Sequence, residues 1–179
     1  MEPGKHELKN GSVLLIREAM VEDARAVLDY IEDISSESDF LSFGPGEFEL
    51  TEAEEEDFLR KCRDLDNQLY IVGLIDDTVA STLAFSAGPR PRVRHSGEFG
   101  MSVRKQYWGL GIGSLMLDTL IDWARATRIV KKINLRVRTD NKQAIALYKR
   151  RGFVIEGTIH QEIFLDGKYF DHYWMGLEL

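Results

Sequence analysis

The chain has 179 residues, of which 44% are hydrophobic, 30% charged and 10% aromatic, a composition typical of globular proteins with a substantial core and not of disordered chains. Its 30 acidic and 23 basic side chains leave a formal charge of -7, which disfavours general nucleic-acid binding and favours a cationic substrate. The opening residues MEPGKHELKN lack a signal-peptide core and no window could span a membrane, so we expect one cytoplasmic domain over residues 1–179.

A strand, a helix and an apolar loop are expected in the first part of the chain. Residues 12–17 (SVLLIR) predict a strand, and residues 24–31 carry apolar side chains at the spacing of one helix face. The segment 35–50 mixes three phenylalanines with glycine and proline. We expect this loop either to pack onto the core or to cover a substrate pocket.

A second helix is predicted to begin at Thr51, which forms a capping box with Glu54. Its expected inner face carries Phe58, Leu59, Cys62 and Leu65, and its acidic stretch, residues 52–57, is expected to be solvated. Cys62 is the only cysteine, so no intramolecular disulfide can form and we interpret this thiol as part of the core.

The second half of the chain predicts two hairpins and a crossover. Residues 69–75 and 79–85 are expected to pair as antiparallel strands. A strand near Phe99, a glycine loop, a helix and a strand at residues 132–137 then form a βαβ unit with parallel strands. Asp140 and Gln143 suggest a capping box for a short helix that stops at Gly152, before a long hairpin of residues 154–165 and 168–177.

The glycine loop WGLGIG suits an anion. Gly109, Gly111 and Gly113 allow positive φ and a close approach to the backbone, and the helix that follows presents unpaired N–H groups at its positive end. A nucleotide P-loop needs a lysine after its last glycine, where this chain has Ser114 and Leu115. The G-x-G-x-G spacing and the hairpin before it also disfavour a dinucleotide fold.

The chain resembles the GNAT superfamily of N-acetyltransferases through two motifs in order. The acetyl-CoA loop of that family, Q/R-x-x-G-x-G/A, corresponds to WGLGIG at residues 108–113, with Trp108 in place of Gln or Arg. Downstream, N-x-x-A-x-x-L-Y-x-x-x-G-F is matched by Asn141, Ala144, Leu147, Tyr148, Gly152 and Phe153.

The resemblance implies an α+β fold, with a strongly twisted mixed sheet of about six or seven strands flanked by about four helices. The central parallel strands, which contain Met101 and Leu135, would splay apart to admit the pantetheine arm of acetyl-CoA. The implied acetyl-CoA contacts are Met101, Ser102, Val103, Trp108, Gly109, Leu110, Gly111, Ile112, Gly113, Ser114 and Asn141. Arg104, Lys105 or Lys142 would either meet outer phosphates or be solvated.

The resemblance also implies catalytic roles. Tyr148 stands where similar proteins place the acid that protonates the departing sulfur, and a phenol is protonated at neutral pH. Glu98 is our first choice for the base, with His95 and Glu162 in reserve, and a mechanism without a dedicated base stays open. Some N-terminal acetyltransferases carry an L-E-V-R glutamate on the next strand, where this chain has Arg136.

We therefore expect an acetyl-CoA-dependent N-acetyltransferase that works by direct attack of a primary amine in a ternary complex, without a metal. The expected acceptor is a small cationic amine. The alternatives are a protein N-terminal acetyltransferase of the ribosomal-protein type and a non-catalytic acyl-CoA sensor. A homodimer formed through the terminal hairpin is a further hypothesis.

Overall fold

The structure is a computed structural model that describes residues 1–179. It is built on one eight-stranded mixed sheet with the order β1-β2-β3-β4-β5-β6-β8-β7, in which only β5 and β6 are parallel neighbours. The strands are β1 (Gly4–Glu7), β2 (Val13–Glu18), β3 (Gln68–Ile75), β4 (Thr78–Ala87), β5 (Ser96–Val103), β6 (Lys132–Arg138), β7 (Val154–Leu165) and β8 (Lys168–Glu178). The predicted fold class is confirmed, and the sheet has more strands than the sequence predicted.

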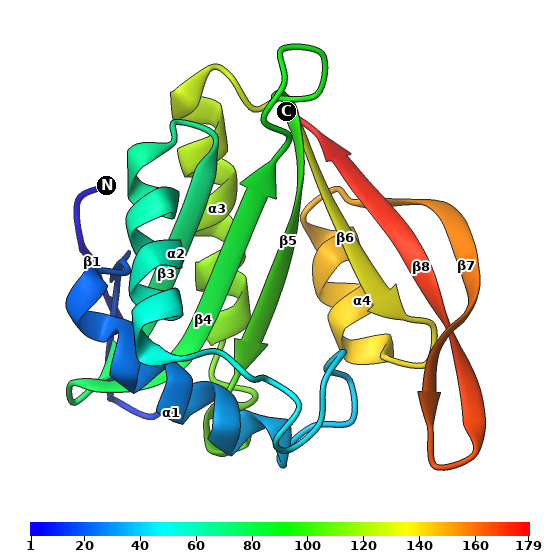
Figure 1. The fold of residues 1–179 in the computed structure, drawn as a ribbon, viewed down its shortest axis with the longest axis horizontal. Helices are drawn as coiled ribbons and strands as arrows, with labels where there is room; N and C mark the ends of the chain where they lie inside the picture. Colours follow the sequence, from blue (N-terminus) through cyan, green and yellow to red (C-terminus); the bar gives the residue numbers. More distant parts are fainter.

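The helices cover both faces of the sheet (Figure 1). The four α-helices are α1 (Ala24–Ser35), α2 (Glu52–Asp64), α3 (Ile112–Thr127) and α4 (Lys142–Arg150). Two short 3-10 turns, Val21–Asp23 and Lys105–Tyr107, precede α1 and the glycine loop. Helices α1 and α2 pack over one apolar cluster, whereas α3 and α4 pack over the larger cluster on the opposite face. None of the helices is long and apolar enough to cross a bilayer.

The additional strand is β1, which sequence periodicity did not indicate. Its four residues, GKHE, are largely polar and alternate between half-buried and exposed. The strand pairs with β2 alone, at the edge of the sheet. Backbone hydrogen bonds therefore define this element, and those bonds leave no apolar pattern in the sequence.

The inner face of α2 differs from the prediction. The capping box of Thr51 and Glu54 is present, but the buried stripe consists of Glu55, Leu59 and Cys62. These positions have i, i+4, i+7 spacing and so share one face. Phe58 and Leu65, predicted to face inward, are 36% and 45% exposed. Phe58 lies at the margin of that stripe, and Leu65 follows the end of the helix in extended backbone.

The N-terminus of α4 also corrects a prediction. Asn141, and not Asp140, is the N-cap, and its Oδ1 accepts a hydrogen bond from the Ala144 N–H at 3.1 Å. Asp140 instead accepts two bonds from Arg138. An arginine partner on the preceding strand thus takes the carboxylate away from the helix end.

The two parallel strands pair over only a short length. Ser96, Gly97 and Glu98 of β5 are in register with Lys132, Ile133 and Asn134 of β6. Beyond Glu98, β5 continues to Val103 beside β4 and β6 continues to Arg138 beside β8. The strands therefore diverge, as the resemblance implied, and one edge of β5 has no strand partner from residue 99 onward (Figure 1).

Candidate active site

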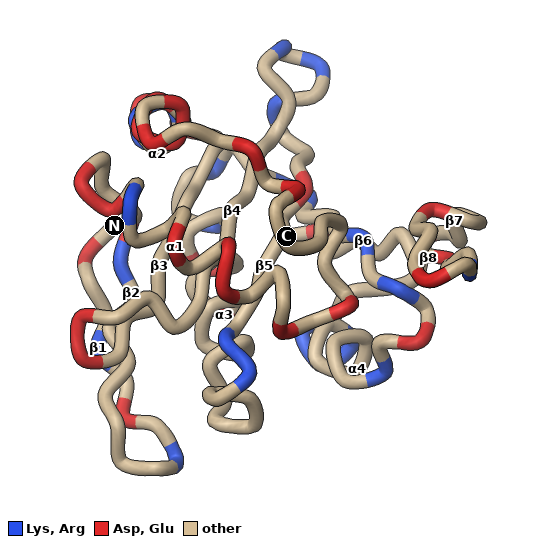
Figure 2. The backbone as a smooth tube through the Cα atoms, turned by 60° about the horizontal axis from the view of Figure 1, so that its bottom comes forward, with Lys and Arg blue, Asp and Glu red and all other residues tan.

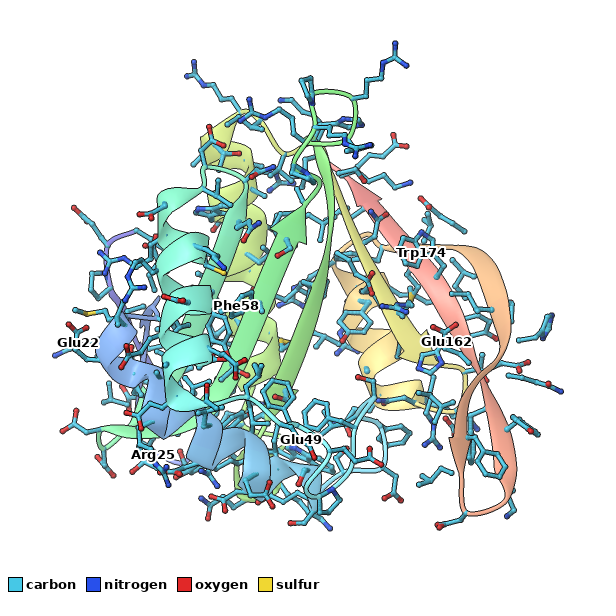
Figure 3. The ribbon with its side chains drawn as sticks, viewed as in Figure 1. Glu22, Arg25, Glu49, Phe58, Glu162 and Trp174 are labelled. Atoms are coloured by element: carbon cyan, nitrogen blue, oxygen red, sulfur yellow. The ribbon has the colours of Figure 1, made fainter.

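A cavity of ≈ 1140 Å³ lies where β5 and β6 diverge. The glycine loop and α4 line it on one face of the sheet, and α2 with the loop before it lines it on the other. The stick view in Figure 3 labels Phe58 on α2 and Glu162 on β7, two lining residues from opposite sides of this divergence. The cavity can therefore receive two reactants from opposite faces.

Most of the residues singled out from the sequence meet at this cavity. Those that line it are Glu98, Met101, Ser102, Val103, Trp108, Gly109, Gly111, Ile112, Gly113, Ser114, Asn141 and Tyr148. Leu110 does not, because it packs against the larger core cluster. Of the reserve bases, Glu162 lines the cavity and His95 does not.

The segment 35–50 combines both predicted behaviours. Phe43 and Phe48 pack against the core cluster under α1 and α2 and also line the cavity. Arg138 of β6 lies over the rings of Phe40 and Phe170, at 4.8 and 3.8 Å, and donates to the Asp39 carbonyl at 2.6 Å. The loop is thus attached to the β6 and β8 side of the cavity.

The glycine loop has the backbone that its sequence requires, with one correction. Gly109 and Gly111 have φ of 81° and 95°, and a Cβ at either position would meet no protein atom within 4 Å. Both therefore combine left-handed backbone with open space beside it. Gly113 lies within α3 without positive φ, and its Cβ would stand 3.4 Å from Leu147. A Cβ there would make only an ordinary contact, so neither backbone conformation nor packing within the protein requires glycine at this position.

The loop offers a row of unpaired donors. The N–H groups of residues 109–113 make no hydrogen bond within the protein. Trp108 and Ser114 are also among the implied acetyl-CoA contacts, but their N–H groups are already engaged. The Trp108 N–H donates to the Lys105 carbonyl at 3.1 Å, and the Ser114 N–H donates to the Gly111 carbonyl at 3.0 Å. Successive free N–H groups at a helix start bind phosphate oxygens, so the anion cradle is residues 109–113.

Trp108, which departs from the family motif, has a structural partner. Its indole Nε1 donates to the Val103 carbonyl at 2.7 Å. This bond joins the start of the glycine loop to the end of β5. The side chain therefore fixes the loop relative to the strand edge, although the indole is 43% exposed.

None of the basic residues expected near outer phosphates, which are Arg104, Lys105 and Lys142, lines the cavity. The Arg104 guanidinium binds Asp33 at 2.8 Å and the Val79 carbonyl at 2.8 Å, so it is engaged elsewhere. Arg150 was not singled out from the sequence, yet it lines the cavity with Gln143 and Leu147. The i, i+4, i+7 spacing of these three positions on α4 was the available signal.

Tyr148 has a buried ring and a free hydroxyl. The residue is 8% exposed, and its ring packs edge-on against Phe99 with the centroids 5.8 Å apart and an interplanar angle of 79°. Its hydroxyl makes no hydrogen bond within the protein and the residue lines the cavity. Burial raises the pKa of Tyr148 to about 12, so the phenol is a hydrogen-bond donor throughout the neutral range.

Glu98 belongs to a charged group on the opposite face of the sheet. Its Oε1 accepts from Arg136 Nε at 2.7 Å, and Arg136 Nη1 also donates to Glu162 Oε1 at 2.8 Å. His172 of β8 was not singled out as a site residue from the sequence. It lines the same part of the cavity, and its buried Nδ1 has no hydrogen-bond partner. Burial lowers the pKa of His172 and the charge of Arg136 lowers it further, against Glu162.

Glu55 is the second buried polar group at the cavity that the sequence did not indicate. It is 1% exposed, and its Oε1 is without a hydrogen-bond partner. Burial raises the pKa of this carboxyl from 4.5 to about 6. The sequence predicted that the acidic stretch of α2 is solvated, and the burial of Glu55 shows that this prediction is wrong at one position.

We expect Glu55→Gln to stabilise the protein at neutral pH. Because the pKa of Glu55 is raised in the folded state, the protonated carboxyl contributes to stability. This contribution is fully present below pH 4.5 and is lost as the pH rises through about 6. Removing the charge should raise the free energy of unfolding by about 2 kcal/mol at neutral pH, and change it little in acid. Thermal unfolding at both pH values measures this, with Glu56→Gln as the control that should show no such difference.

Residues 28–153, more than half of the chain, match the profile of the Acetyltransferase (GNAT) family. The chain belongs to this family. The crystal structure of a GNAT-family acetyltransferase from Streptococcus pneumoniae superposes with a TM-score of 0.90 and 37% identity, over 93% of this chain and 99% of that one.

Two relatives with named substrates match a shorter part of the chain. The L-amino acid N-acetyltransferase AaaT of Escherichia coli is 34% identical over 105 residues, which are 59% of this chain and 65% of that protein. The spermidine N(1)-acetyltransferase of Vibrio cholerae is 30% identical over 79 residues, 44% of this chain and 46% of that protein. The chain thus matches less than two thirds of the length of either relative.

Proposed function

We propose that the protein is an acetyl-CoA-dependent N-acetyltransferase that transfers the acetyl group to a primary amine by direct attack in a ternary complex. The observation that carries this proposal is the single cavity shared by the free N–H groups of residues 109–113, the unpaired edge of β5 and the free hydroxyl of Tyr148. Relatives named as amino-acid and spermidine acetyltransferases support an amine acceptor.

The chain has groups suited to each part of acetyl-CoA. Residues 109–113 would hold the pyrophosphate, and main-chain groups of Met101 and Val103 on the unpaired edge of β5 would bind the amides of the pantetheine arm. The Val103 carbonyl already accepts from Trp108, so Val103 would contribute its N–H group. Asn141 uses Oδ1 as a helix cap, which leaves its Nδ2 for the arm. Arg150 would meet the outer phosphates.

Tyr148 acts on the leaving group in this proposal. Acetyl-CoA supplies the thioester, and transfer to an amine leaves a thiolate that must be stabilised. With a pKa of about 12, the phenol is a weaker acid than a thiol, whose pKa is about 8.5. The hydroxyl therefore stabilises the departing thiolate as a hydrogen-bond donor, while the proton that the attacking nitrogen loses passes to a base.

Glu98 is our first assignment for the group that receives this proton. It lies at the divergence of the strands, and Arg136 orients its carboxylate through a hydrogen bond of 2.7 Å. His172 is the second candidate, because its lowered pKa keeps the imidazole neutral and able to accept a proton. Arg136 occupies the position of the L-E-V-R glutamate, which argues against the particular mechanism of the N-terminal acetyltransferases that use that glutamate.

The test is release of CoA from acetyl-CoA with a panel of polyamines, amino acids and peptides. Turnover with at least one small amine is the expected result. Tight acetyl-CoA binding without turnover on any amine would instead establish the sensor alternative, and turnover only on peptide N-termini would establish the protein acetyltransferase. A homodimer through the terminal hairpin and a cytoplasmic location stay predictions.

A further inference from the structure

The buried carboxylate of Glu55 has no structural task in α2. The helix N-terminus is already capped by Thr51 and Glu54, and Oε1 of Glu55 accepts no hydrogen bond. Buried carboxylates are normally paired or hydrogen-bonded, because an isolated buried charge costs stability. A carboxylate held in this way at the wall of a cavity is suited to a cation that arrives with a ligand.

The surroundings of Glu55 suit an alkyl ammonium. The cavity wall beside it is aromatic, with the Phe43 and Phe48 rings 5.1 Å apart and the Phe58 ring edge-on to Tyr70 at 5.9 Å. Such a wall packs against methylene groups, and its ring faces attract a cation. Figure 2 shows further acidic residues along α2, which add a negative potential outside.

A groove of small residues leads from β5 to this carboxylate. Gly100 of β5 is in register with Ala84 of β4, and Ala84 is in register with Tyr70 of β3. A Cβ on Gly100 would meet nothing within 4 Å, so the floor is open there. Two strand spacings separate Gly100 from Tyr70, which is about 10 Å. Glu55 lies beside Tyr70, whose pKa is raised by burial and by that carboxylate.

The arginines on this side of the cavity are already paired with acceptors of the protein. Arg136 is shared by Glu98 and Glu162, and Arg138 binds Asp140 and the Asp39 carbonyl. No arginine there is left for an acceptor carboxylate, whereas Glu55 lacks a partner. The charge pattern therefore favours an acceptor with a second positive group over an amino acid.

We propose that Glu55 binds a second ammonium group of the acceptor, which is then an aliphatic diamine or polyamine lying along the Gly100–Ala84–Tyr70 groove. This assignment rests on the proposed acetyltransferase function, because it places the reacting nitrogen at β5 and the distal nitrogen at α2. The alkyl chain between the two nitrogens packs on the aromatic wall.

The test is calorimetric binding of putrescine and cadaverine, compared with n-butylamine and n-pentylamine, to the protein in the presence of CoA at neutral pH. The wild type should bind each diamine about tenfold more tightly than the matching monoamine, which is the usual gain from a charged hydrogen bond. Glu55→Gln should abolish this preference, and Glu56→Gln should retain it. Equal binding by the wild type, or a preference that survives in Glu55→Gln, would overturn the assignment.

Turnover separates this inference from the proposed function. If diamines bind through Glu55 but no amine is acetylated, the binding site stands and the transferase proposal fails. If monoamines are acetylated as well as diamines, and Glu55→Gln leaves their ratio unchanged, the transferase stands and the diamine site is wrong. Protection of the wild type from thermal unfolding by diamines, but not by monoamines, gives a readout that needs no variant.

Discussion

Replacing Tyr148 by phenylalanine is expected to lower kcat by about 100- to 1,000-fold while acetyl-CoA binds with nearly unchanged affinity. The substitution removes only the hydroxyl, which has no partner in the protein. The ring would keep its edge-on contact with Phe99 and its tilted contact with Phe153. The loss therefore reports on the hydrogen bond to the leaving sulfur and not on packing.

The measurement is steady-state turnover together with acetyl-CoA affinity by calorimetry. Tyr169→Phe is the matched control, because Tyr169 lies on the terminal hairpin, is 61% exposed and does not line the cavity. It should retain full activity. An equal loss of kcat and acetyl-CoA affinity in Tyr148→Phe would show that the hydroxyl supports the structure of the site and does not act in the chemical step.

The sequence was most informative where a residue type is required by the backbone. Gly109 and Gly111 could be interpreted as positive-φ positions because few other residues adopt that conformation cheaply. The crossover followed from a strand, the glycine loop, an apolar helix stripe and a second strand in order. Asp and Asn both serve as N-cap residues, so the sequence could not decide between Asp140 and Asn141. The predicted N-cap of α4 was therefore wrong by one position.

Side-chain partners across the sheet could not be predicted. Glu55 stands among acidic neighbours on α2, so its composition indicated a solvated face, and only the packing of α2 on β3 and β4 turns it inward. His172 approaches Arg138 through the pairing of β6 with β8. Such pairs depend on strand order and register, which a local pattern does not contain.

The same limit applies to Trp108. The motif comparison marked it only as a departure from Gln or Arg, whereas the structure gives its indole a partner in the Val103 carbonyl. That bond fixes the start of the glycine loop against β5, and in the proposed complex the phosphate contacts come from backbone N–H groups. The binding energy of the loop should therefore depend on backbone conformation more than on any side chain in it.

Gly111→Ala tests this dependence and should weaken acetyl-CoA binding by about 100-fold. Gly111 has φ of 95° at the N-cap of α3, and alanine in left-handed backbone costs about 1–2 kcal/mol. Relief of that strain would turn free N–H groups of the cradle away from the phosphates. Each charge-assisted hydrogen bond lost in this way is worth about 1.5–3 kcal/mol, so one or two such losses account for the expected effect.

Gly167→Ala is the control that separates strain from binding. Gly167 has φ of 76° in the turn of the terminal hairpin, and a Cβ there would also meet nothing within 4 Å. Both variants should lower the free energy of unfolding of the ligand-free protein by similar amounts, but only Gly111→Ala should lose affinity for acetyl-CoA in calorimetry. Unchanged affinity in Gly111→Ala would mean that the pyrophosphate lies elsewhere, because neither the strain nor the added methyl group could then be at the binding surface.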